Sequence, residues 1–314
     1  MEKKQDNLME ISDLTVRYNT DDAVVHAVNN FNLKLVRGEA RGLVGETGAG
    51  KTTLALSILR LLPERVGEVA GGSIVYDGQE LLKLPEAEML PLRGKRISMI
   101  FQDPMTSLNP TQTVGDQILE VLNLHFPEMT RDEKNKRVDE MMTLVGIPPQ
   151  RKKSFPHEFS GGMKQRVVIA MALVAEPELL LADEPTTALD VTIQAQILEL
   201  MKQLREKFNT SVMLITHDLG VVAQFCDSVS VVYAGRVVEY GPVEVVFQRK
   251  ENHPYTAGLF NCIPNLHDDQ PRLHPIAGHM ADPRVEYKGC CFADRCEYAT
   301  ERCRTEAPSM HVCG

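Results

Sequence analysis

The sequence predicts an α/β fold: a parallel sheet at the core, antiparallel strands before it, a helical insertion within it and a small cysteine-rich extension after it. Near the start, residues 9–18 and 24–36 alternate apolar and polar residues around a turn-forming Asn-Thr-Asp-Asp run. Further along, apolar strands alternate with helical patterns, which is typical of a parallel sheet. Five of the seven cysteines fall within the last 25 residues.

The first elements after these strands surround a glycine-rich turn. Residues 42–44 form a short apolar strand, and a helix is expected from about 51 to 62, where Pro63 stops it. Residues 72–76 and 96–101 are expected to be further strands.

Between about residues 103 and 176 the pattern becomes helical. Residues 114–124 and 130–145 both carry helical periodicity. In the second segment, Thr130 is the expected N-cap because Glu133 follows three residues later. This stretch is the predicted helical insertion.

Strands and helices alternate again after the insertion. Strands are expected at 179–182, 212–216 and 229–233, with a helix at 191–208 between them. One face of that helix is apolar and consists of Ile193, Ile197, Leu200, Met201, Leu204 and Phe208. The alternation argues for βαβ units and a parallel sheet.

Domain organisation follows from these patterns and from composition. We expect one domain over residues 7–250, with its helical subdomain at about 103–176, and an extension over 251–314. In the extension the Pro, His and Cys content rises and periodicity fades.

Composition excludes several classes of protein. The chain has 314 residues, 43% of them hydrophobic, and a net charge of −9. An acidic balance argues against a non-specific nucleic-acid binder. The longest apolar runs are about half of the ~20 residues that span a bilayer, and the N-terminus has no apolar signal segment. We therefore expect a cytosolic protein without structural disulfides.

One loop matches the phosphate-binding pattern G-x-x-x-x-G-K-[ST], the Walker A motif. It consists of Gly45, Glu46, Thr47, Gly48, Ala49, Gly50, Lys51 and Thr52, with Thr53 next in the chain. Because it follows a strand and opens a helix, its backbone N–H groups and the positive end of the helix would face phosphate oxygens. Lys51 would reach the β- and γ-phosphates, and the Thr52 hydroxyl would ligate Mg²⁺. The loop predicts ATP binding in a P-loop NTPase core of the RecA-like type; the alternative is a tight turn without a ligand.

Two carboxylates end the apolar strand at 179–182. A buried parallel strand delivers its C-terminal residues to the ligand edge of the sheet. Asp183 would hold the metal, usually through a water, and Glu184 would polarise an attacking water. Without the phosphate loop upstream, the pair would more often be an exposed strand end.

The segment FSGGMKQR opens a helix expected at 163–175. It resembles the signature motif of ATP-binding cassette (ABC) ATPases, with Phe for the usual Leu and Met for the usual Gln. The resemblance implies that Ser160, Gly161 and Gly162 bind the γ-phosphate of ATP held by a partner subunit.

Further elements that resemble the same family follow in its order. Gln102 resembles the Q-loop glutamine, a Mg²⁺ contact; Asp190, ending Thr-Ala-Leu-Asp, resembles the D-loop aspartate; and His217 resembles the switch histidine. The resemblance implies that Glu184, His217 and Gln102 are the catalytic residues. Tyr18 is expected to stack on adenine, with an ordinary strand aromatic as the alternative.

Two segments narrow the resemblance to the importers of dipeptides and oligopeptides. Residues 102–110 read QDPMTSLNP, and residues 253–256 read HPYT before an Ile-Pro pair at 263–264. Nickel importers of the same subfamily share these features, so nickel or another small solute stays open as the cargo.

The terminal cysteines suggest a metal site. Cys290, Cys296, Cys303 and Cys313 give the spacing C-x₅-C-x₆-C-x₉-C. Four thiolates can hold an iron–sulfur cluster or a tetrahedral zinc, and thiols without a metal are a third possibility. The spacing resembles the motif that ends dipeptide-transporter ATPases, which implies a [4Fe–4S] cluster.

Three details of this module stay open in the sequence. Cys291 could exchange with Cys290 as a ligand, and His311 could replace Cys313 in a zinc site. Because the cysteines lie far in sequence from Lys51 and Glu184, we expect a structural or docking role apart from hydrolysis.

The resemblance also implies partners. We expect a second ATP-binding subunit, identical or paralogous, two transmembrane permease subunits that contact the helical insertion, and an extracytoplasmic substrate-binding protein. The chain would then lie on the cytoplasmic face of the membrane. A soluble ABC ATPase acting on DNA or ribosomes is the rival, but the chain has neither a long coiled coil nor a tandem cassette. Glu184 and His217 argue against a third reading, a metal-sensing module without turnover.

Overall fold

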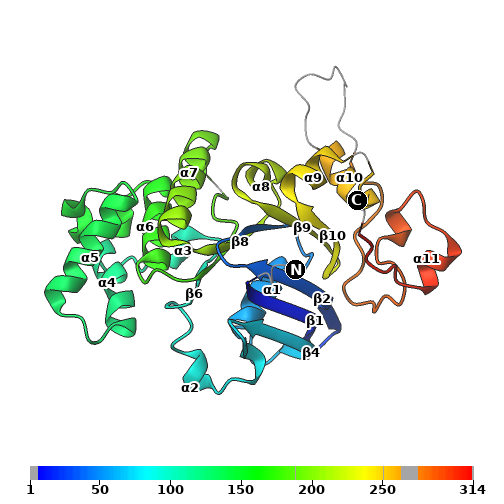
Figure 1. Ribbon diagram of the computed structural model, residues 1–314, viewed down its shortest axis with the longest axis horizontal. Helices are drawn as coiled ribbons and strands as arrows, with labels where there is room; N and C mark the ends of the chain where they lie inside the picture. The colour runs from blue at the N-terminus through cyan, green and yellow to red at the C-terminus, as the bar shows by residue number, and fades with distance from the viewer. Residues whose placement is uncertain (1–5, 188, 250, 263–274, 313–314) are drawn as a thin grey trace.

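The computed structural model describes residues 6–187, 189–249, 251–262 and 275–312. Within these residues the chain forms two sheets, with the helical insertion at one end of the molecule and the C-terminal extension at the other (Figure 1). The first sheet is antiparallel, with strand order β2-β1-β4-β5. Its strands are β1 (Asn7–Asn19), β2 (Val24–Val36), β4 (Gly67–Tyr76) and β5 (Gln79–Glu80).

The second sheet has six strands in the order β10-β9-β3-β8-β7-β6. Five of them run parallel, and β10 pairs antiparallel with β9 at one edge. The strands are β3 (Ala40–Val44), β6 (Ile97–Ile100), β7 (Leu179–Asp183), β8 (Ser211–Thr216), β9 (Ser228–Tyr233) and β10 (Arg236–Pro242). The predicted α/β class and parallel core are confirmed, whereas β10 was not predicted.

Alternate residues of the central strands point to opposite faces, as the two-residue period of a strand requires. On β8, Val212 and Leu214 pack into one core cluster with the helical insertion. Met213 and Ile215 pack into a second cluster with the antiparallel sheet. The parallel sheet is therefore buried on both faces, which explains its continuous apolar strands.

The helical insertion lies between β6 and β7, at the end of the molecule opposite the C-terminal extension (Figure 1). Its elements are α3 (Pro104–Ser107), α4 (Val114–His125), α5 (Arg131–Leu144), η2 (Pro149–Lys153), η3 (Pro156–Glu158) and α6 (Gly161–Leu173). Thr130 caps α5 in a capping box with Glu133, as the sequence predicted. The helix predicted from 163 begins two residues earlier, where Ser160 caps it.

The remaining helices lie outside the insertion. They are α1 (Lys51–Ile58), η1 (Leu81–Lys83), α2 (Glu86–Met89), α7 (Val191–Phe208), α8 (Leu219–Phe225), α9 (Val243–Gln248), α10 (Pro254–Asn261), η4 (Ala293–Arg295) and α11 (Glu301–Thr305). The helix predicted at 191–208 has the same bounds in the structure. The one predicted at 51–62 ends at Ile58, because Arg60 takes a left-handed backbone (φ +53°) before Pro63 is reached.

A third core cluster joins the extension to the six-stranded sheet. Tyr255 of α10 and Phe292 pack against Tyr233 of β9, with ring centroids 4.7 Å and 5.2 Å away. The extension therefore shares its core with the sheet. In the part of the chain described, we find no helix with the length and apolar character needed to cross a bilayer.

Candidate active site

The phosphate-binding loop connects β3 to α1. Gly48 and Gly50 have left-handed backbones (φ +85° and +94°), and a Cβ on Gly50 would collide with the carbonyl of Ala27. Only glycine tolerates this curl without strain. Thr47 and Gly48 form the exposed tip of the loop, whereas Ala49 is buried beneath it. The loop thus has the narrow cradle that a phosphate group requires.

Lys51 folds back into this loop. Its Nζ donates hydrogen bonds to the carbonyl oxygens of Gly45 (2.7 Å) and Glu46 (2.9 Å). Burial lowers the pKa of the Lys51 amine, and the nearby Glu184 and Asp183 carboxylates act in the opposite direction. The cation is therefore buried within the loop, near two acidic groups.

Asp183 ends β7 beside the start of α1. The Thr52 hydroxyl donates a hydrogen bond to Asp183 Oδ2 at 2.7 Å. Burial raises the pKa of Asp183, and the Thr52 hydrogen bond offsets part of that rise. A hydroxyl and a carboxylate oxygen side by side are the ligand types that Mg²⁺ prefers, so these residues fit a magnesium ion.

Glu184 follows directly, in a left-handed backbone conformation (φ +46°). Its Oε1 lies 2.9 Å from His217 Nδ1, and its Oε2 accepts hydrogen bonds from Gln102 Nε2 (3.1 Å) and Thr187 Oγ1 (2.9 Å). Burial raises the pKa of Glu184, but the hydrogen bonds from His217 and Thr187 outweigh it and hold the pKa below its ordinary value. The structure thus brings together the three residues predicted to be catalytic.

Tyr18 lies beside the loop helix. Its hydroxyl donates to Thr53 Oγ1 at 3.2 Å, so the ring stands at the side of α1 where the loop ends. This contact ties the end of β1 to the phosphate-binding loop.

The signature and D-loop residues lie at two helix starts. Ser160 caps α6 and Asp190 caps α7, where its Oδ1 accepts from Ile193 N at 3.0 Å. Gly161 and Gly162 open α6, and a Cβ on Gly162 would collide with Ile193. Over the described residues, none of these four hydrogen-bonds to the phosphate-binding loop or to Glu184. Ala188 of the D-loop lies outside the described residues.

A hydrogen bond connects the ends of the cysteine segment at residues 290–303. The backbone N–H of Cys290 donates to the carbonyl of Cys303 at 2.7 Å. Burial and the neighbouring thiols of Cys296 and Cys303 raise the pKa of the Cys290 thiol. Thr300 contacts Cys303 Sγ through its N–H (3.5 Å) and its hydroxyl (3.3 Å).

The fit of this segment to a metal is partial. Cys313 and the Ile-Pro pair at 263–264 lie outside the described residues, and His311 lies 2.9 Å from Ser309 Oγ. Within the described ranges, no three His, Cys, Asp or Glu side chains come close enough to hold a metal ion. Cys291 is 7% exposed and belongs to the third core cluster, and burial raises its pKa to about 11. Of the two adjacent cysteines, Cys290 is therefore the better placed for a ligand.

Two contacts of the loop were not predicted from sequence. Arg295 forms a salt bridge with Glu46 (2.7 Å), and the Tyr255 hydroxyl accepts the Glu46 N–H (2.8 Å). Arg295 and Tyr255 lie 249 and 209 residues after Glu46 in the chain, so their separation in sequence gave no sign of these contacts. The hydrogen bond from Thr187 to Glu184 was missed as well. That contact is local, since the two residues are three apart, whereas no local spacing signals the contacts of Glu46.

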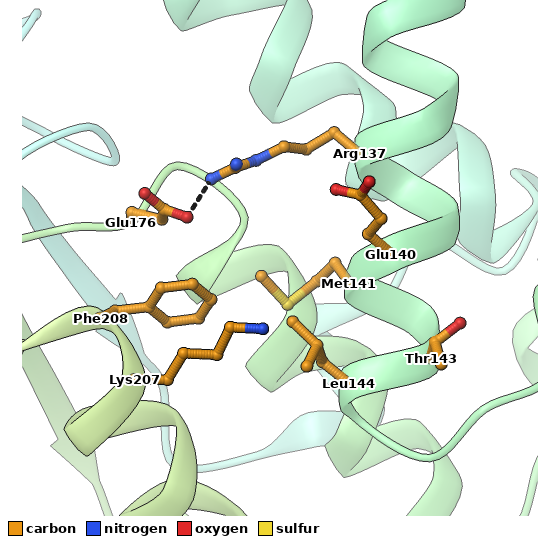
Figure 2. A pocket seen from close by; sticks show the side chains of 8 residues that line it. All are labelled: Arg137, Glu140, Met141, Thr143, Leu144, Glu176, Lys207 and Phe208. Carbon is orange, nitrogen blue, oxygen red and sulfur yellow. Dashed lines mark ion pairs between the residues drawn. The ribbon is translucent and has the colours of Figure 1, made fainter.

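Two of the cavities outside the phosphate-binding loop border the helical insertion. One of about 480 Å³ opens between α5 and the end of α7, where Arg137 pairs with Glu176 (2.6 Å) (Figure 2). No motif falls on its lining. The other, of about 390 Å³, is lined by apolar residues of α4 and α6 and by Phe101, the neighbour of Gln102.

Comparison with known proteins agrees with this geometry. The family model described as ABC transporter matches residues 28–187, and the model for the oligopeptide/dipeptide transporter C-terminal region matches residues 238–303. The oligopeptide transport ATP-binding protein OppD of Haemophilus influenzae is 48% identical, covering 96% of this chain and 93% of the relative. OppD of Salmonella typhimurium is 49% identical, covering 96% and 89%.

Solved structures show the same fold. The ATP-binding cassette MJ0796, in a dimeric post-hydrolysis state bound to ADP and Pi, superimposes with a TM-score of 0.67 at 28% identity, covering 75% of this chain and 98% of the other. The cbiO1 protein of Clostridium perfringens, part of an ABC transporter complex, gives 0.67 at 30% identity, covering 78% and 92%. The chain therefore belongs to the ABC transporter family, in its group of oligopeptide and dipeptide transport ATP-binding proteins.

Proposed function

We propose that this chain binds and hydrolyses ATP to energise the import of oligopeptides through a membrane complex. The observation that carries the proposal is the position of Glu184 beside the Thr52–Asp183 pair, with both carboxylate oxygens held by other side chains. A carboxylate fixed next to a phosphate-binding loop is the arrangement that phosphoryl transfer from ATP to water needs.

Each loop residue has a role in binding. Lys51 exchanges its carbonyl partners for the β- and γ-phosphates, and the backbone N–H groups of the loop donate to phosphate oxygens. Thr52, Asp183 and Gln102 would hold Mg²⁺, which when bound neutralises phosphate charge. Tyr18, fixed by its bond to Thr53, offers its ring to adenine.

Hydrolysis then depends on Glu184. Its carboxylate accepts a proton from the attacking water, and its low pKa keeps it ionised for that role. His217 and Gln102 hold the carboxylate, and we expect them to contact the γ-phosphate and the water as well. These contacts position charge before the reaction, so little reorganisation is needed during it.

A second ATP-binding subunit completes each site. Ser160, Gly161 and Gly162 lie exposed or half-buried at the start of α6, and Asp190 lies at the start of α7. Because they make no hydrogen bond to this chain's own Lys51 loop over the described residues, they are available to the partner's ATP. The partner is an identical chain or a paralogue.

The permease contact is proposed at the cavity beside Phe101. Phe101 is 47% exposed and Leu124 of α4 is 70% exposed, so the rim is apolar and open. Because Phe101 adjoins Gln102, a permease helix seated there could shift the glutamine that contacts Glu184. This contact would hold the chain at the cytoplasmic face of the membrane, while an extracytoplasmic binding protein delivers cargo.

The test uses the importer reconstituted in proteoliposomes with its permeases and binding protein. Oligopeptide-loaded binding protein should stimulate ATP hydrolysis at least severalfold, and Lys51→Ala should abolish nucleotide binding and stimulation. Stimulation by nickel-loaded but not peptide-loaded binding protein would overturn the peptide assignment. Full ATP hydrolysis by Lys51→Ala would overturn the site.

We further propose that Cys290, Cys296, Cys303 and Cys313 hold a [4Fe–4S] cluster. The backbone hydrogen bond between Cys290 and Cys303 brings these two residues together, which supports this ligand set. A bound cluster would supply folding energy to a segment with few apolar residues. Zinc on the same thiolates is the alternative.

Metal analysis separates these possibilities. Protein purified without oxygen should be brown and carry about four irons per chain. Cys303→Ser should lose the iron and expose residues 285–312 to protease. Cys262→Ser should keep both the iron and the resistance of that segment to protease. Stoichiometric zinc without iron would contradict the cluster.

A further inference from the structure

The C-terminal extension reaches the phosphate-binding loop through Arg295. Its two terminal nitrogens donate to both carboxylate oxygens of Glu46, at 2.7 Å and 3.2 Å. The Arg295 side chain is only 4% exposed, and that of Glu46 is 28% exposed. A bidentate guanidinium–carboxylate pair fixes the orientation of the two side chains as well as their distance. This pair is also largely shielded from solvent.

Arg295 is itself held by the extension. It donates to the carbonyl oxygens of Ala277 (3.1 Å) and Ile276 (3.3 Å), and its guanidinium lies 5.8 Å from the ring centroids of Tyr233 and Phe292. The position of the guanidinium is therefore set by the packing around it.

Tyr255 holds the same loop residue by its backbone. Its hydroxyl accepts the N–H of Glu46 at 2.8 Å, and its ring is fully buried against Tyr233. The peptide between Gly45 and Glu46 is trans, so its carbonyl points the opposite way, toward Lys51 Nζ at 2.7 Å. Tyr255 thus fixes the peptide whose other edge contacts the phosphate-binding lysine.

We infer that Tyr255 and Arg295 are positioning residues of the ATP site, and that the C-terminal extension is a structural part of that site. The inference rests on the proposed role of the loop in binding ATP. Over the described residues, neither side chain hydrogen-bonds to Glu184, the residue proposed to activate the attacking water. They fix the conformation of the loop before ATP binds. Binding then costs less conformational entropy, because the loop is already ordered.

This role predicts a particular kinetic signature. Loosening the loop should raise the Kd and KM for ATP while kcat at saturating ATP changes by less than about twofold, because Glu184 and His217 are untouched. A purely structural role would lower the folded fraction and leave the Kd of the folded molecules unchanged.

The experiment measures binding of a fluorescent ATP analogue to the full-length chain, and KM and kcat in the assembled importer. Arg295→Ala should weaken ATP binding about tenfold, which corresponds to about 1.4 kcal/mol. Arg295→Lys should weaken ATP binding less than Arg295→Ala, since lysine keeps the positive charge but cannot form the bidentate pair with Glu46. Tyr255→Phe removes one hydroxyl, keeps the ring packing and should weaken binding about threefold. Arg302→Ala is the matched control, since Arg302 is 83% exposed and pairs with Glu306.

A double-mutant cycle tests whether Arg295 affects ATP binding through the carboxylate of Glu46. If Arg295 acts through the loop carboxylate, Arg295→Ala should cause little further loss of affinity in a Glu46→Ala background. Full additivity of the two losses would overturn the proposed route. Unchanged ATP affinity in both Arg295→Ala and Tyr255→Phe, with Lys51→Ala still unable to bind, would overturn the inference alone. Retained binding in Lys51→Ala would instead remove the proposed site on which it rests.

Discussion

At the scale of single residues, Glu184 shows how distant segments fix one carboxylate. Gln102 follows β6, Thr187 follows Glu184 itself, and His217 follows β8. Because β6, β7 and β8 are neighbours in a parallel sheet, their C-terminal ends meet at the same edge. The carboxylate is therefore oriented by the sheet before any water binds.

His217→Ala should lower ATP turnover by about 10²- to 10³-fold, because it frees Oε1 of Glu184 and removes an oriented polar group. The affinity for ATP should change by less than about threefold. Steady-state hydrolysis by the assembled importer, with nucleotide binding measured in parallel, checks both expectations.

His157→Ala is the matched control for that prediction, since His157 is exposed and stacks on Phe155, 5.9 Å away. Turnover in His217→Ala equal to that in the control would remove His217 from the site.

Sequence reasoning found the residues whose chemistry depends on motif and order. Asp183 and Glu184 could be predicted because they stand where a buried strand ends. Lys51 could be predicted because it belongs to the G-x-x-x-x-G-K-[ST] pattern at the start of a helix. Arg295 could not be predicted, because its partner is 249 residues away in the chain and no repeated spacing connects the two. Contacts of this kind arise from tertiary packing alone.

At the scale of elements, local signals predicted long strands and capped helices well and short elements poorly. The Thr130 capping box and the apolar face of α7 predicted α5 and α7 almost to the residue. The end of α1 was predicted four residues late, because a left-handed residue at Arg60 is not encoded by any proline or glycine there. β10 was not predicted, although Arg236–Pro242 pairs with β9 at the sheet edge.

The start of α10 depends on a half-buried histidine, His253. His253 Nδ1 accepts the N–H of Tyr255 at 3.2 Å, while Glu239 accepts the backbone N–H of His253. Burial lowers the pKa of His253 from 6.5 to about 4. Its contribution to stability is therefore fully present above pH 6.5 and is lost as the pH falls from 6.5 toward 4.

We expect the free energy of unfolding to decrease between pH 6.5 and 4 by more in the wild type than in His253→Asn, with a difference on the order of 3 kcal/mol. Asparagine keeps a cap acceptor but does not titrate. Chemical denaturation at several pH values measures the difference. Parallel pH dependence in the two proteins would show that His253 is not the titrating group.

At the scale of the whole molecule, three core clusters connect the two sheets, the helical insertion and the extension. The first two clusters lie on opposite faces of the parallel sheet. The third carries Tyr233, Tyr255 and Phe292, and it brings the extension against the loop at Glu46. The phosphate-binding loop is therefore supported from both the parallel sheet and the C-terminal extension.

Glu184→Gln tests the central claim, that Glu184 activates the water which hydrolyses ATP. The measurement is single-turnover hydrolysis in the importer assembled with its permeases. The variant should bind ATP about as well as the wild type, because the loop is unchanged, and should hold it unhydrolysed with a rate lowered by at least about 10²-fold. Glu199→Gln, the same change on the exposed face of α7, should hydrolyse normally. A Glu184→Gln importer that hydrolysed bound ATP at the wild-type rate would contradict the account.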